Sequence, residues 1–305
     1  MQIELELLAP AKNKSIGIAA INCGADAVYI AGPKFGAREA AGNSISDIAE
    51  LVVHAHRFGA KVYMVVNTIL YDNELQEAKQ SIIDAYNAGC DAIIIQDLGL
   101  LMMDLPPIEL HASTQTNIRT VEQAKFLESL GFGRLILARE LSTKQIREIK
   151  ESTNTELESF IHGALCVSYS GQCYLSQKIT GRSANRGCCA QACRSDYSLI
   201  DATGELVKDS NGKPLVKNQP ILSLKDLNLS NKISQVIKSG ITSFKIEGRL
   251  KNESYIRNIV LHYRRIIDKF ILENNGYRRA SLGVCTGGFT TNPYLTFNRG
   301  YTELF

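Results

Sequence analysis

Short apolar runs alternate with segments of helical periodicity along most of this chain, and this alternation limits the possible folds more than any other feature. Each run is apolar on both faces, as in the strands of a parallel sheet that helices cover. Several helical segments end in glycine just before the next run, which is typical of a short connection back to a strand. Eight strands are predicted, at residues 3–9, 27–31, 61–67, 92–97, 109–114, 134–139, 157–162 and 243–247.

The economical arrangement of eight such units is a closed (β/α)8 barrel of TIM type, which we predict for residues 1–275. An open, doubly wound sheet is the alternative, but no Gly-x-Gly-x-x-Gly fingerprint follows the first predicted strand. A chain of 305 residues, 45% of them hydrophobic, can bury the large core that a barrel requires. The predicted helices cover residues 13–23, 44–58, 73–88, 121–130, 142–152 and 253–273.

The alternation is interrupted after the seventh predicted strand by an insertion at residues 164–220. Because the insertion leaves the carboxyl end of a barrel strand, it belongs to the face on which barrel enzymes carry their active sites. Its second half, residues 197–215, places Gly204 and Gly212 between alternating residues and predicts a β-hairpin. Residues 276–305 are rich in glycine and threonine. We expect them to form a small β element or the start of a further β domain that is absent here.

The first half of the insertion holds four cysteines with the spacing Cys166-x6-Cys173-x15-Cys189-x3-Cys193. The sequence has no export signal and no apolar run long enough to span a bilayer, so we expect a cytoplasmic protein with reduced thiols. Clustered thiols then indicate metal ligation, either by a structural Zn2+ or by an iron–sulfur cluster. Zinc sites usually bring cysteines in close pairs, and only one such pair occurs here, which favours a cluster. Cys188 is a fifth candidate ligand.

Polar residues gather where the predicted strands end, which a purely structural barrel would not need. Each of them alone could be a satisfied strand-end group, but together they predict a binding site at the carboxyl edge of the barrel. The arginines could hold carboxylates or phosphates, and the histidines could transfer protons. The predicted catalytic residues are His111, His162, Lys245 and Glu247, and the predicted substrate-binding residues are Asn67, Gln96, Gln115, Arg139 and Arg249.

Two blocks around the cysteines carry a resemblance to a known family. Residues 158–176, Glu-Ser-Phe-Ile-His-Gly-Ala-Leu-Cys-Val-Ser-Tyr-Ser-Gly-Gln-Cys-Tyr-Leu-Ser, and residues 185–194, Asn-Arg-Gly-Cys-Cys-Ala-Gln-Ala-Cys-Arg, resemble the collagenase-like U32 peptidase family. Residues 26–30, 35–38 and 297–301 also match its pattern. The resemblance implies a TIM-type barrel, often followed by a β domain. It also implies a [4Fe–4S] cluster on Cys166, Cys173, Cys189 and Cys193, with Cys188 at a variable position.

The family name implies proteolysis, whereas its better understood members resemble oxygen-independent hydroxylases. Some act on a cytidine of ribosomal RNA or a uridine of tRNA with prephenate as a source of the hydroxyl group, and others act on ubiquinone precursors. The sequence contains no His-Glu-x-x-His, no Gly-x-Ser-x-Gly and no local Cys-His dyad. We therefore predict an RNA hydroxylase with RNA as its partner. A peptidase, a hydroxylase of ubiquinone precursors and a non-catalytic, metal-bearing subunit remain as alternatives.

Overall fold

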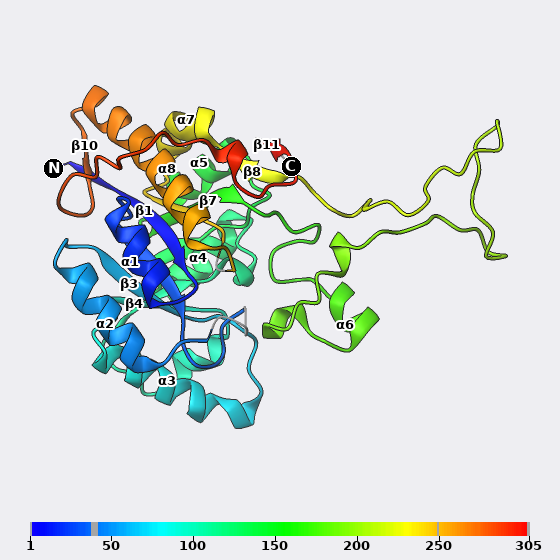
Figure 1. Ribbon diagram of the computed structural model, residues 1–305. Helices are drawn as coiled ribbons and strands as arrows, with labels where there is room; N and C mark the ends of the chain where they lie inside the picture. Colours follow the sequence, from blue (N-terminus) through cyan, green and yellow to red (C-terminus); the bar gives the residue numbers. More distant parts are fainter. Residues whose placement is uncertain (1, 38–41, 249, 304–305) are drawn as a thin grey trace.

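The computed structural model describes residues 2–37, 42–248 and 250–303, and its centre is a closed barrel of eight parallel strands (Figure 1). Strands β1 to β7 follow one another around the ring, and β9 closes it by pairing in parallel with both β1 and β7. The prediction of a (β/α)8 barrel is confirmed. The barrel strands are β1 (Ile3–Ala11), β2 (Ala27–Ala31), β3 (Lys61–Val66), β4 (Ala92–Ile95), β5 (Glu109–Ala112), β6 (Arg134–Ile136), β7 (Glu156–Gly163) and β9 (Ser243–Ile246).

Helices surround the barrel, and several of them begin at residues whose side chains cap them. Ser44, Thr120 and Ser142 each accept a hydrogen bond from a backbone N–H three residues further along the chain, which is the usual way to start a helix. The connection between β4 and β5 contains only the 3-10 turn η3 (Leu98–Met102) in place of a covering helix. The helices are α1 (Lys14–Asn22), α2 (Ile45–His56), α3 (Leu75–Asn87), α4 (Val121–Ser129), α5 (Thr143–Ser152), α7 (Ile233–Lys238) and α8 (Glu253–Glu273).

The barrel interior combines apolar side chains with a buried network of charges. Arg134 donates hydrogen bonds to Glu6 at 2.5 Å and to Glu158 at 3.3 Å, and Glu158 also accepts one from Lys245 at 2.6 Å. Arg134 holds the pKa of Glu6 at about 2, against the desolvation that would raise it. The four side chains come from β1, β6, β7 and β9, so the network ties together strands from both sides of the ring closure.

The insertion after β7 forms a cysteine-bearing loop and an extended arm. The loop contains the short helix α6 (Leu175–Thr180), and the arm, residues 197–219, projects well away from the barrel (Figure 1). The predicted turns at Gly204 and Gly212 are present, with φ angles of 89° and 77°. The segments that these turns join do not form continuous strands. They pair through isolated antiparallel bridges, one of which joins Ile200 and Leu206.

The chain after α8 runs back along the barrel and adds two short strands. Strand β10 (Tyr277–Arg279) pairs with the start of β1, and β11 (Tyr301–Thr302) pairs in parallel with β8 (Asp226–Asn228). Strand β8 in turn pairs antiparallel with the end of β7. The carboxyl-terminal segment therefore reaches the face of the barrel from which the insertion emerges. Within the described ranges, no helix is long and apolar enough to cross a membrane.

Candidate functional site at the barrel mouth

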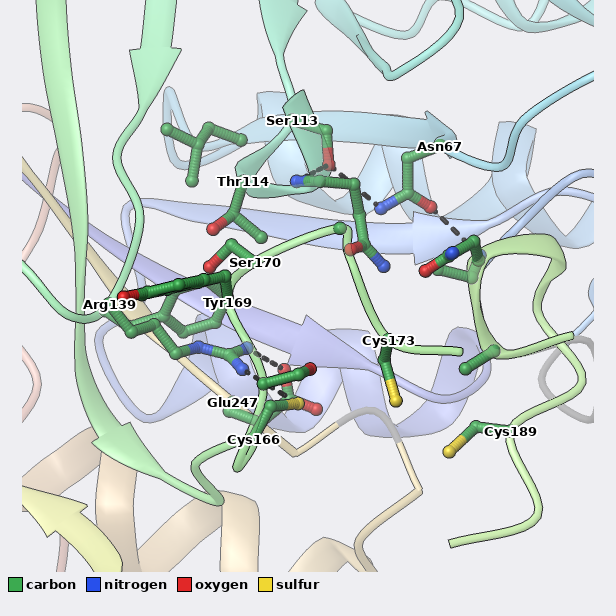
Figure 2. A pocket seen from close by; sticks show the side chains of 18 of the residues that line it. Asn67, Ser113, Thr114, Arg139, Cys166, Tyr169, Ser170, Cys173, Cys189 and Glu247 are labelled. Atoms are coloured by element: carbon green, nitrogen blue, oxygen red, sulfur yellow. Dashed lines mark hydrogen bonds and ion pairs between the residues drawn. The ribbon is translucent and has the colours of Figure 1, made fainter. Parts of the chain in front are cut away.

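A pocket lies between the carboxyl ends of the barrel strands and the cysteine-bearing loop that covers them (Figure 2). Tyr29 and Phe160 from the barrel interior contribute to it, whereas the loop supplies Val167 to Gly171. The loop approaches the strand ends so closely that it acts as the roof of the pocket. Of the predicted site residues, those that line this pocket are Asn67, Gln115, Arg139, Cys166, Cys173, Cys189, Cys193, Lys245 and Glu247.

The loop meets the barrel most closely at Gly171, which has a φ angle of 73°. A β-carbon at this position would lie 2.0 Å from the carbonyl oxygen of Gln115, so the contact requires glycine on both steric and conformational grounds. One residue earlier, the backbone N–H and hydroxyl of Ser170 donate hydrogen bonds to the Glu140 carboxylate at 3.3 and 3.2 Å. These contacts fix the distance between the cysteine-bearing loop and the ends of the barrel strands.

A second anchor holds the far end of the loop against the barrel. The Arg186 guanidinium donates two hydrogen bonds to the carboxylate of Glu74, at 2.9 and 2.6 Å, and a third to the carbonyl of Ile69 at 2.7 Å. The same guanidinium stacks 4.0 Å from the ring centroid of Tyr71. Such a planar, bidentate contact depends on arginine, because a lysine ammonium cannot reproduce its geometry.

Four thiols face the pocket beneath this loop. Cys166, Cys173 and Cys189 lie along the side opposite Asn67 and Ser113 (Figure 2). Burial raises the pKa of the Cys193 thiol, and the charges of the other three thiols add to that rise while Arg194 opposes it.

The donor set suits a metal group bound by four thiolates, since all eight cysteines are free of disulfides and four of them share one pocket. Within residues 2–37, 42–248 and 250–303, no three His, Cys, Asp or Glu side chains already stand in a metal-binding arrangement. Cys188 does not line this pocket and lies instead in the outer groove described below.

Arg139 and Glu247 form the charged wall next to the thiols. A guanidinium nitrogen of Arg139 lies 3.2 Å from a carboxylate oxygen of Glu247, and the two side chains are only 11% and 14% exposed. The other terminal nitrogen of Arg139 is 3.8 Å from the sulfur of Cys166, and the guanidinium stacks 3.9 Å from the ring centroid of Phe160. One arginine thus contacts a thiol, a carboxylate and an aromatic ring, and it sits at the pocket surface.

Lys245 and Asn67 lie deeper, at the floor of the pocket. The Lys245 ammonium is held by Glu158 and lies 4.4 Å from the ring centroid of Tyr29, so its position is fixed by the buried network of the barrel. The Asn67 amide donates to the hydroxyl of Ser113 at 3.3 Å and accepts from the Ala37 backbone at 2.9 Å. Both side chains are preorganised by contacts inside the barrel.

The structure does not bring the two predicted catalytic histidines to this pocket. His111 lies one residue before the end of β5, and its ring is inside the barrel, with Nε2 2.9 Å from the Glu109 carboxylate and the ring against Tyr63. Burial lowers its pKa, and Glu109 only partly opposes that effect. His162 faces α8 instead, where Nδ1 lies 3.2 Å from the Tyr263 hydroxyl.

The remaining predicted residues have different outcomes. Gln96 donates a weak hydrogen bond to the Gln115 carbonyl at 3.4 Å and does not line the pocket. Arg249 lies outside the described residues. The sequence reasoning missed Glu158, the carboxylate that holds Lys245, although an acidic residue within an apolar strand was a visible signal for a buried ion pair.

Comparisons with known proteins agree with the resemblance seen in the sequence. A family model for peptidase family U32 matches residues 12–305. The chain is 52% identical over 301 residues to the Escherichia coli 23S rRNA 5-hydroxycytidine C2501 synthase, covering 99% of this chain and 45% of that protein. The chain therefore spans less than half the length of this relative.

Two further relatives have different names. The chain is 37% identical to tRNA hydroxylation protein P1 of Bacillus subtilis, covering 98% of this chain and 72% of that protein. It is 34% identical to a collagenase of Porphyromonas gingivalis, covering 98% of this chain and 73% of that protein. A solved structure of the U32 peptidase Mk0906 superimposes with a TM-score of 0.51 at 12% identity, covering 81% of this chain and 94% of that chain. That likeness supports the barrel fold.

Proposed function

This chain belongs to peptidase family U32, and within that family we propose that it hydroxylates a base of ribosomal or transfer RNA. The observation that carries the proposal is the pocket in which four thiols meet the Arg139–Glu247 pair at the mouth of the barrel. Relatives named for hydroxylation of RNA, at 52% and 37% identity, support the same reaction. The comparisons favour ribosomal RNA, because the 52% relative acts on that substrate by name.

We further propose that Cys166, Cys173, Cys189 and Cys193 hold a [4Fe–4S] cluster, which would supply redox chemistry beside the pocket. Replacing a ring C–H by C–OH oxidises the base by two electrons. In an oxygen-independent reaction, prephenate would give its hydroxyl group to the base and take up the displaced hydrogen with those two electrons. The cationic residues near the pocket suit a donor that carries carboxylates.

The side chains of this pocket have separable roles in the proposed reaction. Arg139 would bind an anionic group, because its guanidinium is fixed against Phe160 and reaches the pocket surface. Lys245 would contribute a fixed positive charge at the floor. Glu247 lines the pocket beside Arg139 and would accept a proton, a role that the buried His111 and His162 cannot fill from their positions.

Purification without oxygen tests the metal assignment. The proposal expects a brown protein containing iron and sulfide in equal amounts, with the colour lost when any of the four ligand cysteines is replaced by serine. The matched control is Cys188→Ser, which should keep the colour because Cys188 does not line the pocket that the four ligand cysteines share. A colourless protein that contains zinc would overturn the cluster.

Deletion of the gene followed by mass spectrometry of nucleosides from ribosomal and transfer RNA tests the reaction. The proposal expects the loss of one hydroxylated nucleoside, restored by the wild-type gene and not by Arg139→Ala. The collagenase relative supports proteolysis as the second candidate. Unchanged RNA, together with cleavage of denatured collagen that disappears in Cys166→Ser, would favour that candidate instead.

A further inference from the structure

A second, larger hollow opens from the thiols toward solvent, and we call it the outer groove. It has a volume of about 940 Å3 and lies between the cysteine-bearing loop, the start of α8 and the segment 295–299. Cys166, Cys189 and Cys193 line both this groove and the inner pocket. Anything bound in the outer groove would therefore lie next to the proposed reaction centre.

The groove is strongly cationic. Among the described residues, its lining has a single carboxylate, Glu247, and five cationic residues: Arg139, Arg182, Arg194, Lys251 and Arg299. Three of the five already serve the fold, since Arg139 contacts Glu247, Arg194 donates to the carbonyls of residues 165 and 224, and Arg299 contacts Asp226. Arg182 and Lys251 form no ion pair with any described residue.

Lys251 is poised to receive an anion. Desolvation lowers the pKa of its ammonium group, and the carboxylates of Asp226 and Glu247 only partly oppose that effect. The ammonium lies 3.9 Å from the ring centroid of Phe297, and the Arg299 guanidinium lies 4.9 Å from the same centroid. Because Lys251 and Arg182 line the same groove and have no ion pair with a described residue, a phosphate bound there would gain two cationic partners.

Phe297 presents an aromatic surface at the rim of this groove. The residue is 60% exposed, although a phenylalanine of a folded protein normally buries its ring. The backbone around Phe297 is held in place by several contacts. The pairing of β11 with β8 and the contact of Arg299 with Asp226 fix the backbone that follows it, and the Tyr301 hydroxyl donates to the Pro293 carbonyl at 3.0 Å.

We propose that the outer groove binds a single-stranded nucleotide beside the target base, with the neighbouring base stacked on Phe297 and its phosphate on Lys251 and Arg182. This inference rests on the proposed function, because it takes RNA as the substrate. An exposed ring beside cations is the combination by which proteins bind single-stranded nucleic acid. An acidic peptide would use the cations but would bring no base to stack on the exposed part of the ring.

Binding of a short RNA tests the subsite without requiring turnover. The probe is a fluorescently labelled single-stranded octaribonucleotide, and the readout is its anisotropy as the full chain is added. Phe297→Leu should weaken binding by roughly 5- to 150-fold, the range for loss of one base–aromatic stack. Phe297→Tyr should bind within about twofold of wild type, because a tyrosine ring also stacks on a base.

The charge contact has its own signature. For Lys251→Gln, the slope of log affinity against log salt should fall by about 0.7, the value for one phosphate contact with a single strand. Lys144→Gln removes an 87% exposed cation from α5, outside the groove, and should change neither affinity nor slope. Matching thermal unfolding of all variants would show that they fold alike.

The outcomes separate the subsite from the reaction. If wild type and Phe297→Leu bind the octaribonucleotide equally well, or if wild type does not bind it, the subsite is overturned, whether or not the deletion strain lacks a hydroxylated nucleoside. If the variants lose binding while the deletion strain keeps all its hydroxylated nucleosides, the subsite stands and the hydroxylation proposal falls. Binding of denatured collagen that depends on Phe297 would assign the groove to a peptide and would overturn the nucleotide subsite.

Discussion

Gly171 offers the sharpest test of how the cysteine-bearing loop is seated. A β-carbon at this position would lie 2.0 Å from the Gln115 carbonyl oxygen, whereas real contacts of this kind are at least 3.0 Å long, so Gly171→Ala must lift the loop by about 1 Å. Gly181 is a matched control, since it has the same φ angle of 73° and nothing within 4 Å of the corresponding position. The two substitutions share the backbone strain and differ only in the clash.

The expected magnitudes follow from that difference. An alanine in the left-handed region costs about 1–2 kcal/mol, and this strain applies to both variants. The clash adds about 1–3 kcal/mol in Gly171→Ala, the usual cost of overpacking. Because the strained segment is a loop, we expect the added energy to appear as more frequent opening of the roof. The thiol of Cys173 should then become roughly 5- to 150-fold more reactive than in Gly181→Ala.

The assay is the rate of thiol modification in metal-free, reduced protein under native conditions, with urea unfolding measured in parallel. Cys173→Ser in each glycine variant identifies which part of the rate belongs to that thiol. Equal rates and equal losses of stability in Gly171→Ala and Gly181→Ala would refute the reasoning. Such a result would mean that the loop does not rest on Gln115 in solution.

Three other perturbations address the barrel and the second anchor. Burial lowers the pKa of His162 to about 3, so its contribution to stability is complete above its unfolded pKa of about 6.5 and is lost as the pH falls from 6.5 towards 3. Between pH 7 and pH 5 the loss should be about 2 kcal/mol in urea unfolding, and His162→Asn should remove this slope. Lys245→Met leaves the Glu158 carboxylate buried without its ammonium partner and should lower the free energy of unfolding by about 3–5 kcal/mol. Adding Glu158→Gln in the same chain should restore part of this loss, and additive losses would contradict the pairing. In Arg186→Lys, the lysine cannot form the bidentate contact with Glu74. The variant should speed modification of the loop thiols while changing the free energy of unfolding by no more than about 1 kcal/mol. An unchanged modification rate would show that this anchor is dispensable.

The strands could be predicted because a helix-covered parallel barrel requires short runs that are apolar on both faces. The same property hides the direction in which any one side chain points, since such runs carry no alternation. His111 and His162 were expected at the mouth for their position near strand ends, yet one points into the barrel and the other toward α8. Which face a residue takes depends on the registers of the neighbouring strands, and these follow from closure of the ring.

The grouping of the four cysteines in one place could be predicted from their spacing, whereas the residues that surround them could not. Arg186 and Glu74 are separated by 112 positions, and their contact depends on how the loop folds back across the mouth. The outer groove was equally hidden, because Lys251 and Phe297 meet only when the segment after α8 returns along the barrel. Residues that are distant in sequence and joined by irregular backbone leave no periodic signal.

Closure of the ring by β9 also sets an order of events during synthesis of the protein. The Ser243 hydroxyl donates to Glu6 across 237 positions, and Ser243 begins the last barrel strand, so the barrel cannot close until all eight strands have left the ribosome. The partners that seat the cysteine-bearing loop, Gln115 and Glu140, are made before it, but Lys245 and Glu247 are made after it. The four thiols therefore leave the ribosome, and their loop can dock, before the wall formed by Lys245 and Glu247 exists. Until β9 closes the ring, the metal of the proposed cluster could enter through that missing wall.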